Sequence, residues 1–241
     1  MHGAEALVRW THKDFGFMSP EEFIPIAEQT GTIFKLTQYV LNQSMATLAR
    51  LRSQGHSLCM GINVSARDLI EEGLVAYIEY CLTVHQLDPA CLILEVTETS
   101  IMEDLEVASA TLERLRAMGI RTAIDDFGTG QSSMAQLQNL PLDELKIDKS
   151  FVMPMAEEAS CETLVTATID LAHRLGMTVV AEGVEDAYAL NCLQEHGCEV
   201  AQGYYFDRAL PEQAFTEWVA SFRPDQFWTS EQEQAGKTAG A

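Results

Sequence analysis

The chain has 241 residues, of which 47% are hydrophobic and 21% charged, a composition typical of one globular domain with a substantial core. Its 15 Lys and Arg against 36 Asp and Glu give a formal net charge of −21, which argues against a domain that binds duplex nucleic acid. No apolar run could cross a bilayer and no signal sequence opens the chain, so we expect a soluble, cytoplasmic protein without direct membrane insertion. An anchor on a segment outside this chain is left open.

The cysteines and histidines give little indication of a disulfide framework or a metal site. The six cysteines form no CxxC pair and several lie inside apolar runs, which favours reduced thiols over disulfide bonds. The six histidines fall mostly on predicted helices and loops, and no functional role is assigned to them.

Strands and helices are predicted to alternate along the chain. Helical periodicity, with Ser, Pro and Gly at the expected ends, predicts helices that separate the strands. The tail from residue 229 is rich in Gln, Glu, Gly and Ala and is predicted to be disordered. Apolar runs predict strands at residues 3–10, 58–64, 92–96, 120–124, 145–147, 177–181 and 200–202. Helices are predicted at about residues 20–30, 32–54, 65–85, 105–118, 132–139, 157–175, 187–196 and 211–222.

This alternation predicts an α/β fold with a parallel sheet, either closed as a barrel or open and doubly wound. A (β/α)8 TIM-like barrel is favoured, because polar residues recur at the ends of all the strands rather than at one switch point. Seven strands are one short of eight, so either the barrel is incomplete or one strand precedes residue 1.

The motif DDFGTG at residues 125–130 places two adjacent carboxylates at the end of a predicted buried strand. Two such groups repel each other, and divalent cations relieve that repulsion while using both as ligands. The glycines allow a sharp turn beside a ligand. A solvated Asp–Asp turn is the plain alternative, because Asp and Gly favour turns in any protein.

Other predicted strands also end in polar groups that would meet at one mouth of the barrel. Each has a simpler explanation by itself: Asn63 could cap a helix, Lys146 could lie on the surface and Glu182 could belong to a turn. Together they would repel strongly without a cation, and their oxygen donors favour Mg²⁺ or Mn²⁺ over Zn²⁺. The set comprises Glu5, Asn63, Glu95, Asp125, Asp126, Lys146, Glu182 and Gln202.

These residues occur in motifs that resemble a known family, the EAL domains, which are cyclic di-GMP phosphodiesterases named for a tripeptide present here at residues 5–7. The resemblance covers nearly the whole chain, from residue 5 to about residue 222. The motifs occur in the family's order: EALVRW, SPEEFIPIAEQTG, NVSARDL, EVTET, DDFGTG, KID, EGVE and QGYYF.

The resemblance implies a metal-dependent hydrolase that converts cyclic di-GMP to linear pGpG, within a barrel whose first strand is antiparallel to the others. Lys146 would orient the attacking water, and Glu98 would stabilise the loop after the aspartate pair. The implied ligands of two divalent cations, Mg²⁺ or Mn²⁺, are Glu5, Asn63, Glu95, Asp125, Asp126 and Glu182, with Asp125 bridging. The implied catalytic residues are Glu5, Lys146, Glu182, Asp125 and Asp126. The implied substrate-binding residues are Arg9, Leu7, Gln202, Glu185 and Asp148.

Two departures from the family pattern stand out. A helix and a strand usually precede the EAL strand, so we expect that N-terminal strand to be missing here and the chain to belong to a larger protein with other signalling domains. Gln131 replaces an aromatic residue in a loop that couples the metal site to dimerisation in the family. The resemblance also implies a homodimer. We therefore expect an EAL phosphodiesterase domain at residues 1–228, short at its N-terminus, and a disordered tail at residues 229–241.

Three functions are compatible with these patterns. An active cyclic di-GMP phosphodiesterase in bacterial second-messenger signalling is favoured, because no implied ligand is lost. A catalytically silent receptor that binds the dinucleotide and signals through a partner is the alternative. An unrelated barrel that serves only as an interaction scaffold would leave the polar residues at the strand ends unexplained.

Overall fold

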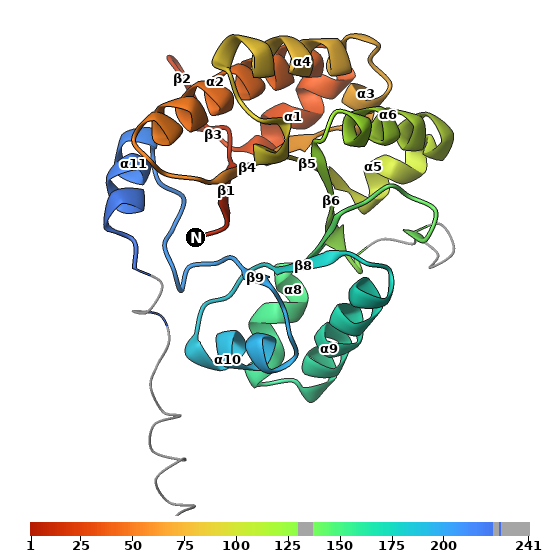
Figure 1. The fold of residues 1–241 in the computed structure, drawn as a ribbon, viewed down its shortest axis with the longest axis vertical. Coiled ribbons are helices and arrows are strands. Elements are labelled where there is room, and N and C mark those ends of the chain that lie inside the picture. The colour runs from red at the N-terminus through yellow and green to blue at the C-terminus, as the bar shows by residue number, and fades with distance from the viewer. Residues whose placement is uncertain (130–136, 224–226, 228–241) are drawn as a thin grey trace, which may run out of the picture.

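Seven strands form one parallel sheet in the computed structural model, which describes residues 1–129, 137–223 and 227 (Figure 1). Strands such as β5 (Leu92–Thr97) and β7 (Glu144–Ile147) are buried along nearly their whole length, as parallel strands covered on both faces are. The strands lie side by side in chain order. The other five are β1 (Gly3–Ala6), β4 (Cys59–Val64), β6 (Arg121–Phe127), β8 (Thr178–Ala181) and β9 (Val200–Ala201).

The sheet curls until its two edge strands, β1 and β9, approach each other. Gln202, directly after β9, donates a hydrogen bond from Nε2 to Oε2 of Glu5 on β1 over 2.9 Å. The curled sheet with helices around it confirms the predicted (β/α)8-like barrel and excludes the open doubly wound alternative. Every pairing in the described sheet is parallel, so the expected antiparallel strand does not lie within it.

The helices lie around the outside of the sheet (Figure 1). Their ends follow local signals: Ser19 begins α1 with a capping box, in which its backbone N–H donates to Oε2 of Glu22 at 3.2 Å. None of the described helices is both long enough and apolar enough to span a membrane. The helices are α1 (Pro20–Gln29), α2 (Ile33–Ser53), α3 (Ala66–Leu69), α4 (Gly73–His85), α5 (Glu98–Glu103), α6 (Leu105–Ala117), α8 (Lys149–Val152), α9 (Ala159–Arg174), α10 (Ala187–Glu195) and α11 (Glu212–Ser221), with short 3-10 helices η1 (Pro89–Cys91) and η2 (Met153–Ala156).

Three local predictions need correction. The strand expected at residues 3–10 ends at Ala6, and a hairpin of β2 (Trp10–His12) and β3 (Gly16–Met18) follows it. The single helix expected at 65–85 is two helices, because the capping box from Ser65 to Asp68 closes one short turn before α4 begins. Two short helices that were not predicted, α5 and α8, follow β5 and β7. The helix expected at 132–139 falls largely outside the described residues.

Charged side chains lie at the amino end of the barrel as well as at its mouth. Arg121, the first residue of β6, donates from Nη1 to Oε1 of Glu144, the first residue of β7, over 2.8 Å. Glu144 is only 3% exposed, and this pair neutralises its charge. The carboxyl ends of the strands carry a different and much more acidic cluster of side chains.

Candidate active site

A buried lysine on β7 lies at the centre of the carboxyl end of the barrel. Lys146 is 2% exposed, and its Nζ lies 2.6 Å from Oε2 of Glu95, 2.8 Å from Oε1 of Glu182 and 3.0 Å from Oδ1 of Asp125. Glu5 is the fourth carboxylate, at 3.8 Å. These groups come from separate strands, and parallel strands with the same direction bring their carboxyl ends together.

Amide side chains hold the Glu5 carboxylate from two sides. Asn63 on β4 donates from Nδ2 to Oε1 of Glu5 over 2.6 Å, and Gln202 donates to the other oxygen. Both amides were predicted site residues, and the structure brings both to the cluster. Each also offers a carbonyl oxygen, which is a ligand that divalent cations accept.

The aspartate pair lies where β6 becomes irregular. The pairing of β6 with β7 shifts register between Ile124 and Phe127, and such a bulge re-aims side chains at the end of a strand. Asp126 has a φ of 55°, a left-handed conformation uncommon outside glycine, and its N–H donates to Oδ1 of Asp125 at 3.0 Å. The two carboxylates are therefore held in different directions from one short segment.

A hydrogen bond connects the loop after the aspartate pair to the residue that directly follows β5. Oε2 of Glu98 accepts a hydrogen bond from the N–H of Gly128 at 3.3 Å, in line with the loop-stabilising role implied for Glu98. Gly128 has a φ of 100°, which side chains rarely permit. Gln131 lies outside the described residues.

Burial and mutual repulsion shift the protonation equilibria of this cluster. Burial raises the pKa of Glu95 to about 8, with Glu5 adding to the rise and Lys146 opposing it. Burial likewise raises the pKa of Glu182 to about 7, against the opposing effect of Lys146. Burial alone would lower the pKa of Lys146, but the surrounding carboxylates outweigh it and leave that pKa raised. One cation thus fails to neutralise the carboxylates around it.

The second aspartate has its own neighbour. Burial raises the pKa of Asp126 to about 6, and the charges of Asp125 and Asp148 add to the rise. Asp148 begins α8, where its Oδ1 accepts a hydrogen bond from the N–H of Ser150 at 3.0 Å. Burial raises the pKa of Asp148, but the hydrogen bonds from Ser150 lower it, and the net effect is a lowered pKa.

The donor set fits divalent cations. Two groups of carboxylates have oxygens within 4.8 Å of one another, Glu5 with Glu95 and Asp125, and Asp125 with Asp126 and Glu182. The two groups share Asp125, so two adjacent cations would share that ligand. All the donors are oxygens, which hard cations prefer.

A glycine that the sequence reasoning missed makes room for this arrangement. A Cβ on Gly61, within β4, would overlap Oε1 of Glu95. A glycine inside a strand often marks a close approach of another group. The glycine within the predicted strand LCMGINV therefore indicates that a side chain packs against this strand.

Three predicted substrate-binding residues do not touch the carboxylate cluster. Leu7 lies just beyond β1 and is 45% exposed. Arg9 is exposed, and its Nη1 donates to the carbonyl of Val8 at 2.9 Å. Glu185 is exposed in the segment between β8 and α10. All three belong to segments that leave the carboxyl ends of β1 and β8.

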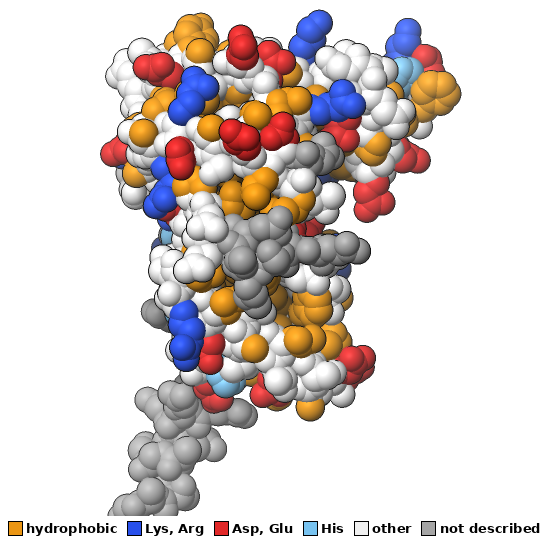
Figure 2. Space-filling model, turned by 90° about the vertical axis from the view of Figure 1, so that its right-hand side faces the viewer, with side chains coloured by type: hydrophobic (Ala, Val, Ile, Leu, Met, Phe, Trp, Pro, Cys, Tyr) orange, Lys and Arg blue, Asp and Glu red, His pale blue; other side chains and the backbone are white. Residues whose placement is uncertain are grey.

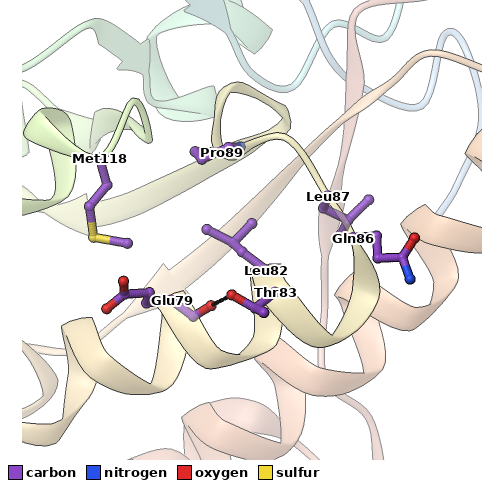
Figure 3. Close-up of a pocket in the computed structure, with 7 residues that line it drawn as sticks. All are labelled: Glu79, Leu82, Thr83, Gln86, Leu87, Pro89 and Met118. Atoms are coloured by element: carbon purple, nitrogen blue, oxygen red, sulfur yellow. Dashed lines mark hydrogen bonds between the residues drawn. The ribbon is translucent and has the colours of Figure 1, made fainter.

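A separate hollow lies near the amino ends of β5 and β6 (Figure 3). Glu79 is the one carboxylate among its lining residues, which otherwise are apolar or uncharged, so it offers no converging catalytic groups. On the face seen in Figure 2, acidic and basic side chains are interspersed, and the described residues there form no continuous basic surface. The hollow is lined by Glu79, Leu82, Thr83, Gln86, Leu87, Pro89 and Met118.

Fold and site together define a (β/α)8-like barrel with an acidic, lysine-centred cluster at its mouth. The family model of the EAL domain matches residues 1–209, so the chain belongs to the EAL domain family. This confirms the resemblance drawn from the motifs.

Relatives and solved structures agree with this assignment. The chain is 41% identical over 226 residues to the cyclic di-GMP phosphodiesterase NbdA of Pseudomonas aeruginosa, covering 93% of this chain and 29% of the relative. It is 38% identical to the bifunctional diguanylate cyclase/cyclic di-GMP phosphodiesterase MucR of the same species, covering 91% of this chain and 32% of the relative. The structure of the PaMucR phosphodiesterase in complex with c-di-GMP superposes with a TM-score of 0.84 and 38% identity, covering 89% of this chain and 87% of that one. The chain therefore spans about a third of the length of these curated relatives.

Proposed function

We propose that this chain hydrolyses cyclic di-GMP to linear pGpG with the help of two divalent cations, Mg²⁺ or Mn²⁺. The observation that carries the proposal is the pair of carboxylate groups that share Asp125 around Lys146. The relatives named as cyclic di-GMP phosphodiesterases, and the related structure with c-di-GMP, support the choice of substrate.

The proposed cation ligands are the oxygen donors of the cluster. Bound there, the cations would offset phosphate charge and activate water for attack on phosphorus. Asp125 would serve both cations because it belongs to both carboxylate groups. The proposed set is Glu5, Asn63, Glu95, Asp125, Asp126 and Glu182.

Lys146 is proposed to position the attacking water and to offset negative charge as the phosphorus–oxygen bond breaks. Its ammonium group is held by three carboxylates within 3.0 Å, so it stays charged and fixed in place. Gln202 would orient Glu5 through the hydrogen bond between them.

Groups around the mouth are proposed to hold the dinucleotide. Arg9 would pair with a phosphate, for which a guanidinium group is well suited, once its side chain turns from the Val8 carbonyl. Leu7, Glu185 and Asp148 would complete the binding surface. Asp148 is already close to the cluster through Asp126.

Assembly and location follow as further proposals. We propose that the domain works as a homodimer within a larger signalling protein, in line with the relatives that extend well beyond it. The proposed location is the cytoplasm, where thiols such as the six free cysteines stay reduced.

Purified chain incubated with cyclic di-GMP and Mn²⁺ or Mg²⁺ tests the proposal, with linear pGpG measured by chromatography. Turnover should disappear in Glu5→Gln and persist in Glu113→Gln, a matched control on the exposed face of α6. Binding of the dinucleotide without turnover would instead establish a silent receptor, and turnover that survives Glu5→Gln would remove the cluster from the mechanism.

A further inference from the structure

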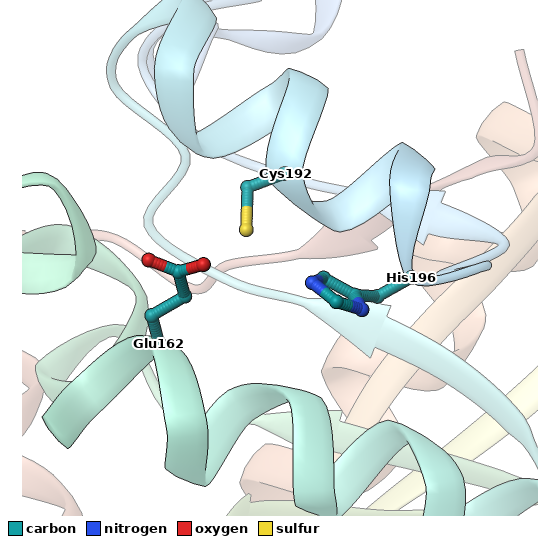
Figure 4. A group of neighbouring side chains, drawn as sticks. All are labelled: Glu162, Cys192 and His196. Carbon is teal, nitrogen blue, oxygen red and sulfur yellow. The ribbon is translucent and has the colours of Figure 1, made fainter. Parts of the chain in front are cut away.

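A second cluster of potential metal ligands lies between two outer helices, α9 and α10 (Figure 4). Glu162 of α9 faces Cys192 of α10 and His196 at the end of α10. One donor atom from each side chain lies within 4.8 Å of the other two. Sulfur and imidazole nitrogen are donors that Zn²⁺ prefers, in contrast to the oxygen donors at the barrel mouth.

The spacing of the ligands on α10 places them on one face of the helix. Tyr188, Cys192 and His196 are each four residues apart, so their side chains follow one another along the same face. The Tyr188 hydroxyl donates to Oε2 of Glu162 over 3.0 Å. That hydrogen bond orients the carboxylate, as a supporting partner does in protein metal sites.

Burial differs across the three ligands in a way that suits an ion entering from solvent. Cys192 is only 8% exposed, Glu162 is half-buried and His196 is exposed. The sulfur therefore lies at the inner end of the cluster and the imidazole at its entrance. Three protein ligands leave one tetrahedral position of Zn²⁺ for water.

We propose that Glu162, Cys192 and His196 bind one Zn²⁺ ion that links α9 to α10. The thiol of Cys192 releases its proton to solvent as its sulfur bonds the ion, while carboxylate and imidazole donate lone pairs without losing a proton. The two linked helices follow β7 and β8, the strands that position Lys146 and Glu182. The ion therefore stabilises the half of the barrel that supports these two groups.

Co²⁺ is the probe, because thiolate ligation gives it a near-ultraviolet charge-transfer absorption that an oxygen-only site cannot produce. The full chain is freed of metal with a chelator, saturated with Mg²⁺ to fill the oxygen sites, and titrated with Co²⁺. We expect this absorption to saturate at one equivalent. It should be absent in Cys192→Ser, and His196→Gln should bind Co²⁺ at least tenfold more weakly.

Cys161→Ser is the matched control. Cys161 is adjacent to Glu162 on α9, but its Sγ points to Oε2 of Glu158 at 3.6 Å. The absorption should persist in this variant. Its persistence in Cys192→Ser, its loss in Cys161→Ser or its absence from the unmodified protein would overturn the proposal.

Melting measurements give a second readout that does not depend on phosphodiesterase activity. With Mg²⁺ saturating, Zn²⁺ should raise the melting temperature of the unmodified chain, because it binds the folded state. The increase in melting temperature should disappear in His196→Gln. Because the His196 side chain is exposed, this substitution should leave the fold intact, so the loss would report lost Zn²⁺ binding. An equal increase in both proteins would place the ion elsewhere and refute the link between α9 and α10.

Discussion

Replacing Lys146 with methionine tests the electrostatic reasoning most directly. The substitution keeps much of the side chain's volume but removes the positive charge among Glu95, Glu182 and Asp125. Removing one partner from a buried charge pair costs about 3–5 kcal/mol. We therefore expect metal-free Lys146→Met to lose about 3–5 kcal/mol of unfolding free energy near pH 8.

The loss should be smaller at lower pH, because the carboxylates can then take up protons. In the unmodified protein the pKa of Glu95 is raised to about 8 and that of Glu182 to about 7, above the ordinary value of 4.5. The folded state therefore binds more protons than the unfolded state between about pH 4.5 and 8, and stability falls as pH rises through that window. For each additional proton that the folded state binds relative to the unfolded state, the free energy of unfolding falls by about 1.4 kcal/mol per pH unit. Without Lys146 the fall should be steeper.

Urea unfolding at about pH 5.5 and pH 8, with chelator or with saturating Mg²⁺, measures these differences. Mg²⁺ should recover much of the stability lost at the higher pH, because it supplies positive charge to the same oxygens. Lys35→Met is the control, since Lys35 is exposed on α2. A loss that is equal at both pH values, or that Mg²⁺ leaves unchanged, would refute the reasoning.

Three further changes probe the same cluster. Asp125→Asn should lower kcat by several orders of magnitude with little change in folding, measured by pGpG release and circular dichroism, because Asp125 belongs to both carboxylate groups. Gly61→Ala should weaken Mg²⁺ binding at least tenfold in calorimetry, since its Cβ would displace the Glu95 carboxylate; unchanged affinity would show that Glu95 is not a ligand. Mg²⁺ at fixed concentration should raise the melting temperature more at pH 8 than at pH 6, because protons compete for carboxylates with raised pKa values such as Glu95, Glu182 and Asp126.

The barrel and most of the cluster followed from the sequence, because both depend on local patterns. Apolar runs between helical segments predicted all seven strands of the sheet, and the parallel direction brought their last residues together. The carboxylates at those ends were therefore predicted as neighbours. The hydrogen bond from Gln202 to Glu5 joins residues far apart in the chain, and it lies where strand order places it.

Other features depended on contacts that the sequence does not encode locally. The hairpin after β1 is held by pairing between Trp10 and Met18 rather than by a clear alternation of residues. The cluster of Glu162, Cys192 and His196 combines two helices whose relative placement only the folded chain gives. No spacing within one helix indicates this grouping, because Glu162 belongs to the other helix.

The net charge of the chain bears on the proposed substrate binding as well as on the proposed catalysis. A cyclic dinucleotide carries two negative phosphodiester groups, and this chain has a formal charge of −21 with four carboxylates around Lys146. Approach to such a mouth is unfavourable unless cations reverse the local field. Arg9 alone cannot do so, because it is exposed and lies outside the cluster. Divalent cations should therefore increase the affinity for the dinucleotide even in Asp125→Asn, provided that one cation site remains filled, and affinity independent of cations would place the dinucleotide away from the carboxylates.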